Sequence, residues 1–464
     1  MTDSIPQITL PRKPHYRTID QEIDFFELFR RIEPQFDNCF LLESLGEDGD
    51  RARTHVMGFD PATLVHATDM NQLIVTDTRT DEVTHYETNN AYNALRELIP
   101  QDVIARQYCG GLTGYIGYDS IRFFEPTLDI KTTDQFEAFK FGIYRDGLLL
   151  DKMTGQITYF YYEEDRYDQV IEILQQPEAE PGAIEVEFCG DGMNEAEHAE
   201  AVDRARDDIC AGLIFQVQLG FKSHYKVRGD TLQIYQKLRE VNPSPHMNYI
   251  KFGQQRIIGA SPELLFRLQQ GEMETYPLAG TAKRGADKKE DQALARTLLN
   301  DPKEIAEHNM LVDLHRNDIG RVAQFGSVKV RNLMDIKKFS HVQHISSEIV
   351  GIISYEEDMF SALAANFPAG TLTGAPKIEA MKIIDDLEPE GRGPYGGAVG
   401  HFGFNGDCAF AIPIRSVFVN GEQGYLQTCG GNVYDSNAKD EYQEIQRKSA
   451  AMKQVLSSFE VPSK

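Results

Sequence analysis

Two stretches of alternating hydrophobic and polar residues stand out in the second half of the chain. They are "RIIGASPELLFRLQ" at 256–269 and "CAFAIPIRSVFVNGEQGYLQTCGG" at 408–431. Alternation with a period of two is typical of β-strands that bury one face, and Asn420-Gly421 is typical of a hairpin turn. Such strands cluster along the chain and do not alternate regularly with helices. This pattern predicts an α+β protein with largely antiparallel sheets.

Helical segments are marked by their capping residues. Asn194, followed three positions later by Glu197, predicts a capping box at a helix start, and Gly212 is a typical helix stop. Asp301 and Pro302 are likewise typical of the first residues of a helix. We therefore predict helices over 194–211, over 301–322, from about 375–376 onward, and over 440–456.

The middle of the chain predicts a domain boundary. It is rich in acidic residues, and Pro177 and Pro181 interrupt any helix there. We place the boundary at about 175–193, between an N-terminal domain, 1–185, and a second domain, 194–464.

One glycine pattern occurs twice. "GGLTGYIGY" at 110–118 and "GGAVGHFGF" at 396–404 have glycines at the same four spacings. A dinucleotide-binding loop would continue into an amphipathic helix, but aromatic and extended residues follow each run here. The pattern therefore predicts closely packed, glycine-rich strands.

Composition places the chain among soluble globular proteins. Its 464 residues suffice for two or three domains, and 41% of them are hydrophobic. The net charge of −25 disfavours nucleic acids and anionic membranes as partners, although a local cationic site still allows an anionic substrate. We see no membrane-spanning run and no signal peptide. Six scattered cysteines without a CxxC pair predict reduced thiols and a cytoplasmic location.

Acidic residues recur on two of the predicted helices. Glu304 and Glu307 are three positions apart on one, and Glu441 and Glu444 are three apart on the other. By itself, the first pair is explained as an acidic first turn of a helix. The second is explained by a surface ion pair between Glu444 and Lys448. Mg²⁺, however, takes one or two carboxylates together with waters and substrate oxygens. We therefore expect a Mg²⁺ site and keep the surface interpretation open.

Other residues favour a small anionic substrate. A Gly-Thr turn in "FPAGTLTGAPK" precedes a helix start, whose N–H groups attract negative charge, without the Gly-Lys-Ser/Thr ending of a nucleotide loop. Glu263 is flanked by apolar residues, which raise the pKa of a carboxyl and suit a general acid. His344 and Arg415 complete the set, although such residues are individually more often structural. The residues alone thus indicate an enzyme for a small anion, with its reaction left open.

Longer motifs resemble the chorismate-utilising enzymes, and most closely component I of anthranilate synthase. The resemblance covers essentially all of 194–464, and the N-terminal half is similar through "LLES" and "GGLTGYIGYD". It implies two interlocking halves whose largely antiparallel sheets form a sandwich with helices outside, the second half being catalytic. The motifs that carry it are "NPSPHMNY", "GASPELLF", "PLAGTAKRG", "DPKEIAEHNMLVDLHRND", "PAGTLTGAPK", "RGPYGGAVG", "AIPIR" and "EYQE".

The resemblance also implies a reaction: chorismate and ammonia would give anthranilate and pyruvate through aminodeoxyisochorismate, the first step of tryptophan biosynthesis. Glu263 matches the acid that protonates the departing ring hydroxyl, and His344 matches the histidine of pyruvate elimination. Glu307 and Glu444 match Mg²⁺ ligands, with Glu441 acting through water. The implied substrate-binding residues are Gln216, Gly280, Thr281, Thr371, Tyr395, Arg415, Gly430, Gly431 and Lys448.

Two positions point to ammonia as the nucleophile. Ala279 stands where the related enzymes that make aminodeoxychorismate have a nucleophilic lysine, and a methyl group has no lone pair to attack a ring. Gln216 stands where isochorismate-forming enzymes have a lysine that activates water. Since the chain has no glutaminase-like cysteine, a separate glutamine amidotransferase subunit is implied. An enzyme that stops at aminodeoxyisochorismate, and an inactive tryptophan-sensing paralogue, remain alternatives.

A regulatory site is implied as well. "LLES" and "NPSPHM" resemble the family's site for the inhibitor L-tryptophan at the junction of the halves, with a packing contact as the alternative. His246 replaces a usual tyrosine, and Cys429, elsewhere in the chain, replaces a usual glycine. The chain itself contains no tryptophan, which suits an enzyme needed when tryptophan is scarce. The candidate inhibitor-binding residues are Glu43, Ser44, Pro245, His246 and Met247.

Overall fold

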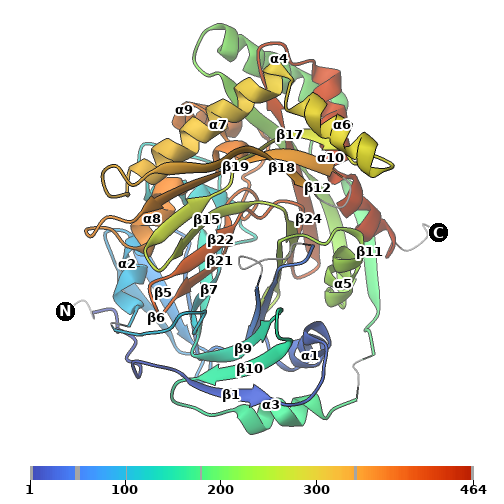
Figure 1. Ribbon diagram of the computed structural model, residues 1–464. Coiled ribbons are helices and arrows are strands. Elements are labelled where there is room, and N and C mark those ends of the chain that lie inside the picture. Colours follow the sequence, from blue (N-terminus) through green and yellow to red (C-terminus); the bar gives the residue numbers. More distant parts are fainter. Residues whose placement is uncertain (1–3, 47–52, 101, 178–179, 339–341, 461–464) are drawn as a thin grey trace.

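The computed structural model describes residues 4–46, 53–100, 102–177, 180–338 and 342–460, and two large antiparallel sheets dominate it (Figure 1). In spatial order, the first sheet contains β1 (His15–Ile19), β10 (Gln156–Tyr161), β9 (Asp146–Asp151), β3 (Thr54–Phe59), β2 (Asn38–Glu43), β13 (His246–Phe252), β14 (Gln255–Ser261), β23 (Ser416–Asn420), β24 (Gln423–Asn432), β12 (Gln216–Gly229) and β11 (Ile184–Asp191), with β20 (Gly374–Ala375) on β12.

The second sheet is equally large. In spatial order, it contains β17 (Leu278–Lys283), β19 (Val342–Ile352), β16 (Glu272–Thr275), β15 (Leu264–Gln269), β22 (Cys408–Ala411), β21 (Ala398–Gly403), β7 (Gly111–Ile116), β8 (Phe139–Tyr144), β4 (Thr63–Ala67), β5 (Gln72–Asp77) and β6 (Val83–Glu87), with β18 (Lys329–Lys338) on β19.

Both sheets contain strands from both halves of the sequence. In the first sheet β2 pairs with β13, so that Glu43 lies opposite Met247. In the second sheet β7 pairs with β21, so that Gly114 lies opposite Gly400. Strand β11, which lies within the expected boundary segment, pairs with β12 at one edge of the first sheet. The halves therefore interlock through backbone hydrogen bonds, as the resemblance implied.

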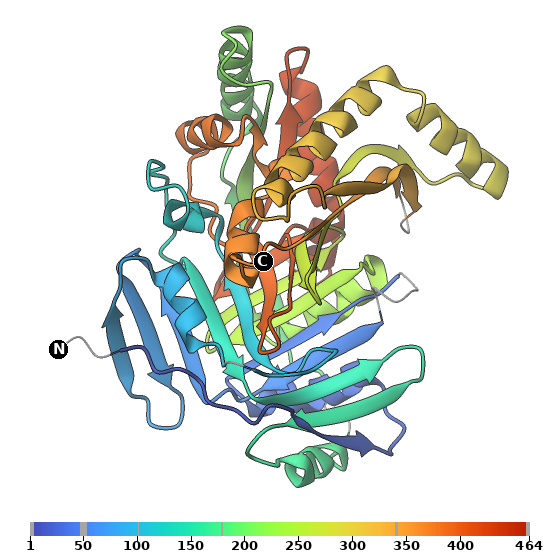
Figure 2. The ribbon, with the colours of Figure 1, turned by 60° about the vertical axis from the view of Figure 1, so that its left-hand side comes forward.

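Helices lie outside the sheets (Figures 1 and 2). Helix α7 contacts β17 and β19, α10 contacts β24, and α9 contacts β12. Figure 2 shows α6 projecting from the body of the molecule. The helices are α1 (Phe25–Ile32), α2 (Ala91–Leu98), α3 (Tyr167–Leu174), α4 (Glu195–Cys210), α5 (Leu232–Val241), α6 (Lys288–Leu298), α7 (Pro302–Gly320), α8 (Met359–Asn366), α9 (Lys377–Leu387) and α10 (Ala438–Ser457), with short 3₁₀ turns η1 (Glu33–Gln35), η3 (Tyr118–Phe123) and η4 (Gly370–Leu372).

The predicted starts of α4 and α7 are confirmed. Asn194 and Glu197 form the capping box of α4. Asp301 accepts hydrogen bonds at the start of α7, and Pro302 is its first residue. The last helix, α10, begins two residues earlier than predicted, because Asn437 caps it.

The repeated glycine pattern marks two neighbouring strands, as predicted. β7 and β21 are paired through these glycines, and no amphipathic helix of a dinucleotide-binding loop follows either within the described residues. A Cβ on Gly111 would lie 2.0 Å from the carbonyl oxygen of Phe402, and the φ of Gly111 is +149°. Only glycine allows the strands to approach this closely.

Each of the two long alternating runs is divided between the sheets. The first run becomes β14 in the first sheet and β15 in the second. The second run becomes β22 in the second sheet, then β23 and β24 in the first, with the predicted turn at Asn420-Gly421. Most residues of these strands are buried on both faces of the sheets, so the hydrophobic pattern alone does not reveal where the chain changes sheet.

One large core contains side chains of both sheets. Phe40 and Phe418 come from the first sheet, and Phe141, Phe402 and Phe410 from the second. A second core packs helices α1, α3, α5 and α10 against the first sheet, and a third packs α4 and α9 against β12. Burial of these apolar side chains supplies the main stabilisation of the fold.

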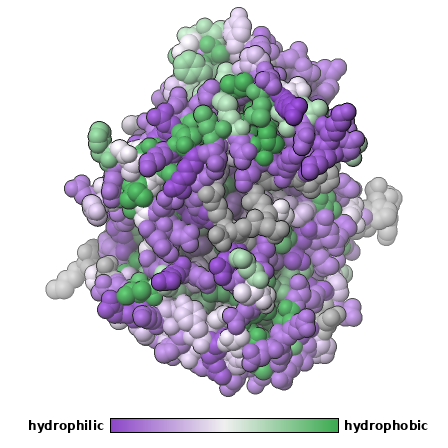
Figure 3. All heavy atoms as spheres, viewed as in Figure 1, coloured by the Kyte–Doolittle hydropathy of each residue, from purple (hydrophilic) through white to green (hydrophobic). Residues whose placement is uncertain are grey.

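The face of the molecule seen in Figure 3 is mostly hydrophilic, with hydrophobic residues scattered over it. None of the helices in the described residues has the length and apolar character needed to cross a membrane. All six cysteines are free thiols, in agreement with the prediction.

Candidate active site

Two of the places where the chain passes from one sheet to the other lie side by side and bring Glu263 and Arg415 together. Glu263 lies between β14 and β15, and Arg415 lies between β22 and β23. The backbone N–H of Ile412 donates to the carbonyl oxygen of Glu263 at 3.1 Å. That of Ala260 donates to the carbonyl oxygen of Arg415, also at 3.1 Å. Backbone hydrogen bonds thus fix the two positions relative to each other.

Glu263 is a buried carboxyl, only 6% exposed, and accepts a hydrogen bond from the Thr371 hydroxyl at 2.8 Å. Burial raises its pKa to about 7, although the Thr371 hydrogen bond and the charges of Arg415 and Lys448 oppose the rise. A carboxyl with this pKa is partly protonated at neutral pH and is suited to donate a proton. The predicted general acid therefore has the environment that this role needs.

Arg415 is half-buried and holds a positive φ of 50°. Burial lowers the pKa of its guanidinium, while Glu263 and Tyr395 oppose this. Among the described residues, its guanidinium makes no hydrogen bond and no close ion pair. A guanidinium held in place without such a partner is suited to bind a carboxylate through two parallel hydrogen bonds.

His344 on β19 faces a bulge in β17. The strand register shifts between Ala279 and Ala282, and Gly280 there has a φ of +64°. Nδ1 of His344 lies 2.8 Å from the Gly280 carbonyl oxygen and 3.1 Å from the Thr281 hydroxyl. Because a carbonyl only accepts, Nδ1 carries the proton and Nε2 is the basic nitrogen of the neutral ring. The bulge thus orients the predicted histidine.

Burial, together with the charges of Arg415 and Lys448, lowers the pKa of His344 to about 4, although the Gly280 carbonyl opposes this. The ring is therefore neutral at physiological pH. The same two cations act on Glu263. Glu263, His344, Arg415 and Lys448 therefore belong to one electrostatic environment.

Gln216, Gly430 and Gly431 line the adjoining part of the sheet, where β12 pairs with β24. A Cβ on Gly431 would lie 2.8 Å from Nε2 of both Gln216 and Gln218, so glycine leaves room for these amides. Nε2 of Gln216 also donates to a carboxylate oxygen of Glu307 on α7 at 3.3 Å. This contact connects the sheet to the predicted metal ligands.

The acidic residues of α7 and α10 influence one another. Burial raises the pKa of Glu304, and Glu307 and Glu444 raise it further. Burial likewise raises the pKa of Glu441, with a contribution from Glu444, although Ser436 donates a 2.7 Å hydrogen bond to it. The second carboxylate oxygen of Glu441 is buried without a hydrogen-bond partner. Carboxylates that repel one another, with one unpartnered oxygen, fit a cation.

The structure also adds Glu304 to this group, which the predicted ligand set left out. A Cβ on Gly280 would lie 2.7 Å from its carboxylate oxygen, so Glu304 approaches the bulge of β17. Its spacing of three from Glu307 was the available signal. Nowhere in the described parts of the chain do three or more His, Cys, Asp or Glu side chains converge closely enough to hold a metal by themselves.

Lys448 and Tyr395 meet at Cys429. Nζ of Lys448 lies 2.6 Å from a carboxylate oxygen of Glu444 and donates to the carbonyl oxygen of Cys429 at 3.1 Å. The Tyr395 hydroxyl donates to Sγ of Cys429 at 3.2 Å. The thiol in turn donates to Oε1 of Gln218 at 3.5 Å. Cys429, noted in the sequence only as an unusual residue, therefore supports two predicted substrate-binding residues.

The candidate inhibitor residues gather where β2 pairs with β13. Glu43 is 4% exposed and accepts hydrogen bonds from Tyr235 at 2.8 Å and from Arg239 at 2.9 Å. Burial opposes ionisation, but these partners and His55 together lower the pKa of Glu43. The carboxylate is thus charged and already paired within the protein, so it stabilises the contact between the two halves of the chain.

His246 and Met247 lie in β13, and Ser44 and Pro245 lie directly next to β2 and β13 along the chain. The Ser44 carbonyl oxygen accepts hydrogen bonds from His55 at 3.1 Å and from Lys152 at 2.9 Å. Pro245 and Met247 are buried. Burial lowers the pKa of His246 to about 3, so this ring is neutral.

Known proteins resemble the chain over its full length. The family of chorismate binding enzymes matches residues 37–454. A Leptospira biflexa protein named anthranilate synthase component 1 is 51% identical, with 100% of both chains covered. A protein of the same name from Methanothermobacter thermautotrophicus is 40% identical over 96% of this chain and 94% of the relative.

A solved structure agrees with these relatives. The crystal structure of anthranilate synthase component I from Streptococcus pneumoniae superimposes with a TM-score of 0.77 at 32% identity, covering 88% of this chain and 93% of that one. Full-length similarity, the shared fold and the gathering of Glu263, His344 and Arg415 all indicate the same family. The chain belongs to the chorismate binding enzyme family and, within it, to the anthranilate synthase component 1 proteins.

Proposed function

We propose that the chain converts chorismate and ammonia to anthranilate, pyruvate and water through aminodeoxyisochorismate. The observation that carries this proposal is the gathering of a carboxyl of pKa about 7, a neutral histidine and a guanidinium without a close partner in one environment. These groups supply a proton donor, a proton acceptor and a carboxylate-binding cation. The names of the relatives support the same reaction.

In the first step ammonia forms a bond to a ring carbon of chorismate, and the ring hydroxyl leaves with its bonding electrons. Glu263 donates the proton that turns this hydroxyl into water. Ala279 is a buried residue of β17, and its methyl group has no lone pair to form a covalent bond with the ring. Gln216 is an amide and does not activate water as a base. Both residues leave ammonia as the nucleophile.

In the second step a ring C–H bond and the ring C–O bond to the enolpyruvyl group break, and this group gains a proton on its methylene carbon to leave as pyruvate, which makes the ring aromatic. The neutral imidazole of His344 accepts the ring proton at Nε2, since Nδ1 donates to Gly280. Arg415 and Tyr395 hold the enolpyruvyl carboxylate, and Gly430 and Gly431 leave space beside it. Thr281 and Thr371 line the same region through their contacts with His344 and Glu263.

We further propose Mg²⁺ as the cofactor. Glu307 and Glu444 would hold it, with Glu441 and Glu304 close by, and Lys448 balances the charge of Glu444. When bound, the ion neutralises the ring carboxylate of chorismate. The mutual repulsion of these carboxylates and the unpartnered oxygen of Glu441 support this proposal.

Two partners complete the proposal. A separate glutamine amidotransferase subunit supplies ammonia, because the chain offers no glutaminase-like cysteine. L-tryptophan binds beside Glu43, Ser44 and residues 245–247 and inhibits the reaction. Because β2 and β13 come from different halves, an inhibitor that prefers one arrangement of this junction shifts the enzyme toward that arrangement.

The first prediction concerns the nitrogen source. The purified chain is expected to make anthranilate and pyruvate in equal amounts from chorismate, MgCl₂ and an ammonium salt, but none when glutamine replaces ammonium. Anthranilate fluorescence and a coupled pyruvate assay check this together. Turnover of glutamine by the chain alone, or accumulation of aminodeoxyisochorismate without pyruvate, would contradict the proposal.

The second prediction separates the two proton transfers. Glu263→Gln should consume chorismate at least about 100-fold more slowly, the usual loss for a general acid. His344→Met should still consume chorismate but accumulate aminodeoxyisochorismate. Since Glu263 acts in its protonated form, wild-type kcat should fall as pH rises through about 7. Chromatography of the mixtures decides, and unchanged chorismate with His344→Met would show that our division of roles is wrong.

The third prediction tests the metal residues. Glu307→Gln and Glu444→Gln should each lower Mg²⁺-dependent turnover at least about 100-fold and weaken Mg²⁺ binding in calorimetry, because each loses one carboxylate charge. Glu379→Gln, on α9 and paired only with Lys382 among the described residues, is the control and should behave as wild type. Normal Mg²⁺ binding by either test variant removes that residue from the ligand set.

The fourth prediction tests the inhibitor site. Calorimetry should detect one molecule of L-tryptophan per chain, and the same concentrations should inhibit ammonium-dependent turnover. Glu43→Gln should weaken binding about 10-fold, because the ion pair with Arg239 that supports the junction is lost. D-tryptophan serves as the control ligand. If L-tryptophan releases no heat of binding, the junction is a packing contact only.

A further inference from the structure

A fully buried ion pair lies behind the active site. Arg392 is 2% exposed and Glu388 is 3% exposed. Nε of Arg392 donates to one carboxylate oxygen of Glu388 at 2.9 Å, and Nη2 donates to the other at 2.7 Å. Burial of two charges has a large desolvation cost. The attraction within a bidentate pair offsets this cost only when further hydrogen bonds satisfy both groups.

Those further hydrogen bonds reach three other elements. Arg392 donates to the carbonyl oxygens of Leu372 in η4 at 2.6 Å and of Gln218 in β12 at 2.8 Å. Glu388 accepts from the backbone N–H of Gly220 in β12 at 3.0 Å and from the side chain of Gln427 in β24 at 3.2 Å. The pair therefore connects the end of α9 to η4, β12 and β24.

The connection to η4 leads directly to the proposed acid. Leu372 follows Thr371, whose hydroxyl donates to Glu263. The turn has only two backbone hydrogen bonds of its own, from Leu372 N–H to Ala369 and from Thr373 N–H to Gly370. Arg392 therefore adds a strong, charge-assisted bond to a short turn that sets the position of Thr371.

The connection to β12 leads to the proposed carboxylate site. The side chain of Gln218 accepts a hydrogen bond from Cys429, which accepts one from Tyr395. The Arg392 guanidinium also lies 5.8 Å from the centre of the Tyr395 ring and 4.6 Å from that of Tyr118. One guanidinium thus contacts the supports of both Glu263 and Tyr395.

We propose that Arg392 and Glu388 are positioning residues of the reaction, which hold Thr371 against Glu263 and Tyr395 beside the substrate carboxylate. They act through Leu372 and Gln218 and lie outside the proposed contacts with the substrate. The effect on the reaction rate rests on the proposed function. The effect on the structure of η4 can be measured without substrate.

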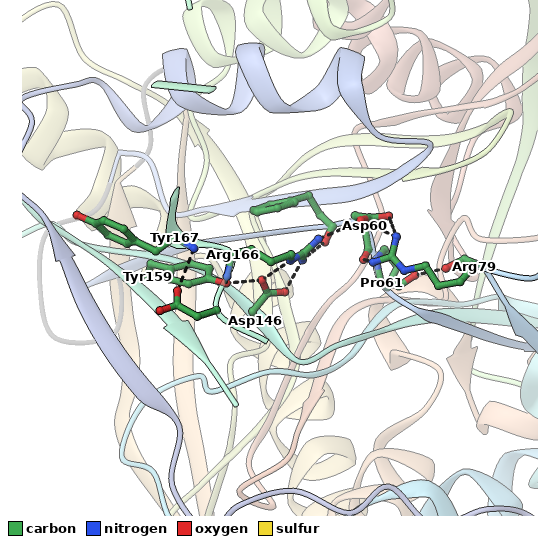
Figure 4. Close-up of polar contacts among 10 residues, drawn as sticks. Asp60, Pro61, Arg79, Asp146, Tyr159, Arg166 and Tyr167 are labelled. Atoms are coloured by element: carbon green, nitrogen blue, oxygen red, sulfur yellow. Dashed lines mark hydrogen bonds and ion pairs between the residues drawn. The ribbon is translucent and has the colours of Figure 1, made fainter. Parts of the chain in front are cut away.

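A second ion pair, which is largely buried, provides a control (Figure 4). Arg166 donates to both carboxylate oxygens of Asp146, at 2.9 and 2.6 Å, and to Asp60 and the Phe59 carbonyl oxygen. Tyr159 donates to Asp146 at 2.7 Å. This pair has the same bidentate geometry but connects strands and loops of the N-terminal half, away from the candidate active site.

The experiment compares Arg392→Lys and Glu388→Gln with Arg166→Lys and Asp146→Asn. Each substitution removes the bidentate geometry or one charge, and all four should lower the melting temperature. Only the first two should lower kcat, by at least about 10-fold, because a small displacement of catalytic groups has a large effect on rate. Glu388→Gln keeps the size of the side chain and provides the test if Arg392→Lys does not fold.

A pH profile separates positioning from a general loss of stability. Because the Thr371 hydrogen bond lowers the pKa of Glu263, its loss should move the fall of kcat to higher pH in Arg392→Lys and Glu388→Gln. Thr371→Val should show the same shift by direct removal of the bond. Arg166→Lys should retain the wild-type profile.

Hydrogen exchange without substrate provides the structural arm. The amides of Leu372 and Thr373 should exchange faster in Arg392→Lys and Glu388→Gln than in wild type, and at the wild-type rate in Arg166→Lys. If both test variants keep wild-type kcat, pH profile and exchange while the wild type makes anthranilate, the inference is wrong and the proposed function stands. If the wild type makes no anthranilate, the proposed function fails, and the exchange rates alone decide whether the pair positions η4.

Discussion

The constraint on which the site depends is that two of the crossings of the chain between its two sheets lie next to each other. The first crossing joins β14 to β15 and carries Glu263, and the second joins β22 to β23 and carries Arg415. Backbone hydrogen bonds between the crossings fix both residues. Each of these residues lies between paired strands, so the strand hydrogen bonds on either side hold its backbone in place.

Burial at this place sets the protonation states. It raises the pKa of Glu263 to about 7 and lowers that of His344 to about 4, so that near neutral pH Glu263 is partly protonated and His344 is neutral. The same low-polarity surroundings strengthen the attraction of Arg415 for an anion. In the proposed reaction, these opposite shifts would provide a proton donor for the first step and a proton acceptor for the second.

The interlocking of the two halves also connects the candidate inhibitor site to the candidate active site. Because β2 pairs with β13, the charged cluster around Glu43 bridges segments about 200 positions apart in sequence, and β13 leads through β14 to Glu263. A ligand at the junction would therefore act on a strand that is hydrogen-bonded to the strand preceding the acid. The buried pair of Arg392 and Glu388 is hydrogen-bonded to η4 and β12, the elements that carry Thr371 and Gln216.

The sequence by itself determined the local features. Capping residues marked the starts of α4 and α7, repeated glycines marked the close pair of β7 and β21, and the motifs with Ala279 and Gln216 indicated family and nucleophile. Hydrogen bonds of caps and turns join residues a few positions apart, so their signals lie within short segments.

Only the tertiary structure decided which distant residues meet. The alternating run at 256–269 did not show that Glu263 marks a change of sheet, and the spacing of Glu304 from Glu307 did not show that Glu304 reaches Gly280. Nor did the sequence indicate that Arg392 pairs with Glu388 and supports two strands and a turn. These contacts depend on strand register and on the packing of one sheet against another, which no window of neighbouring residues encodes.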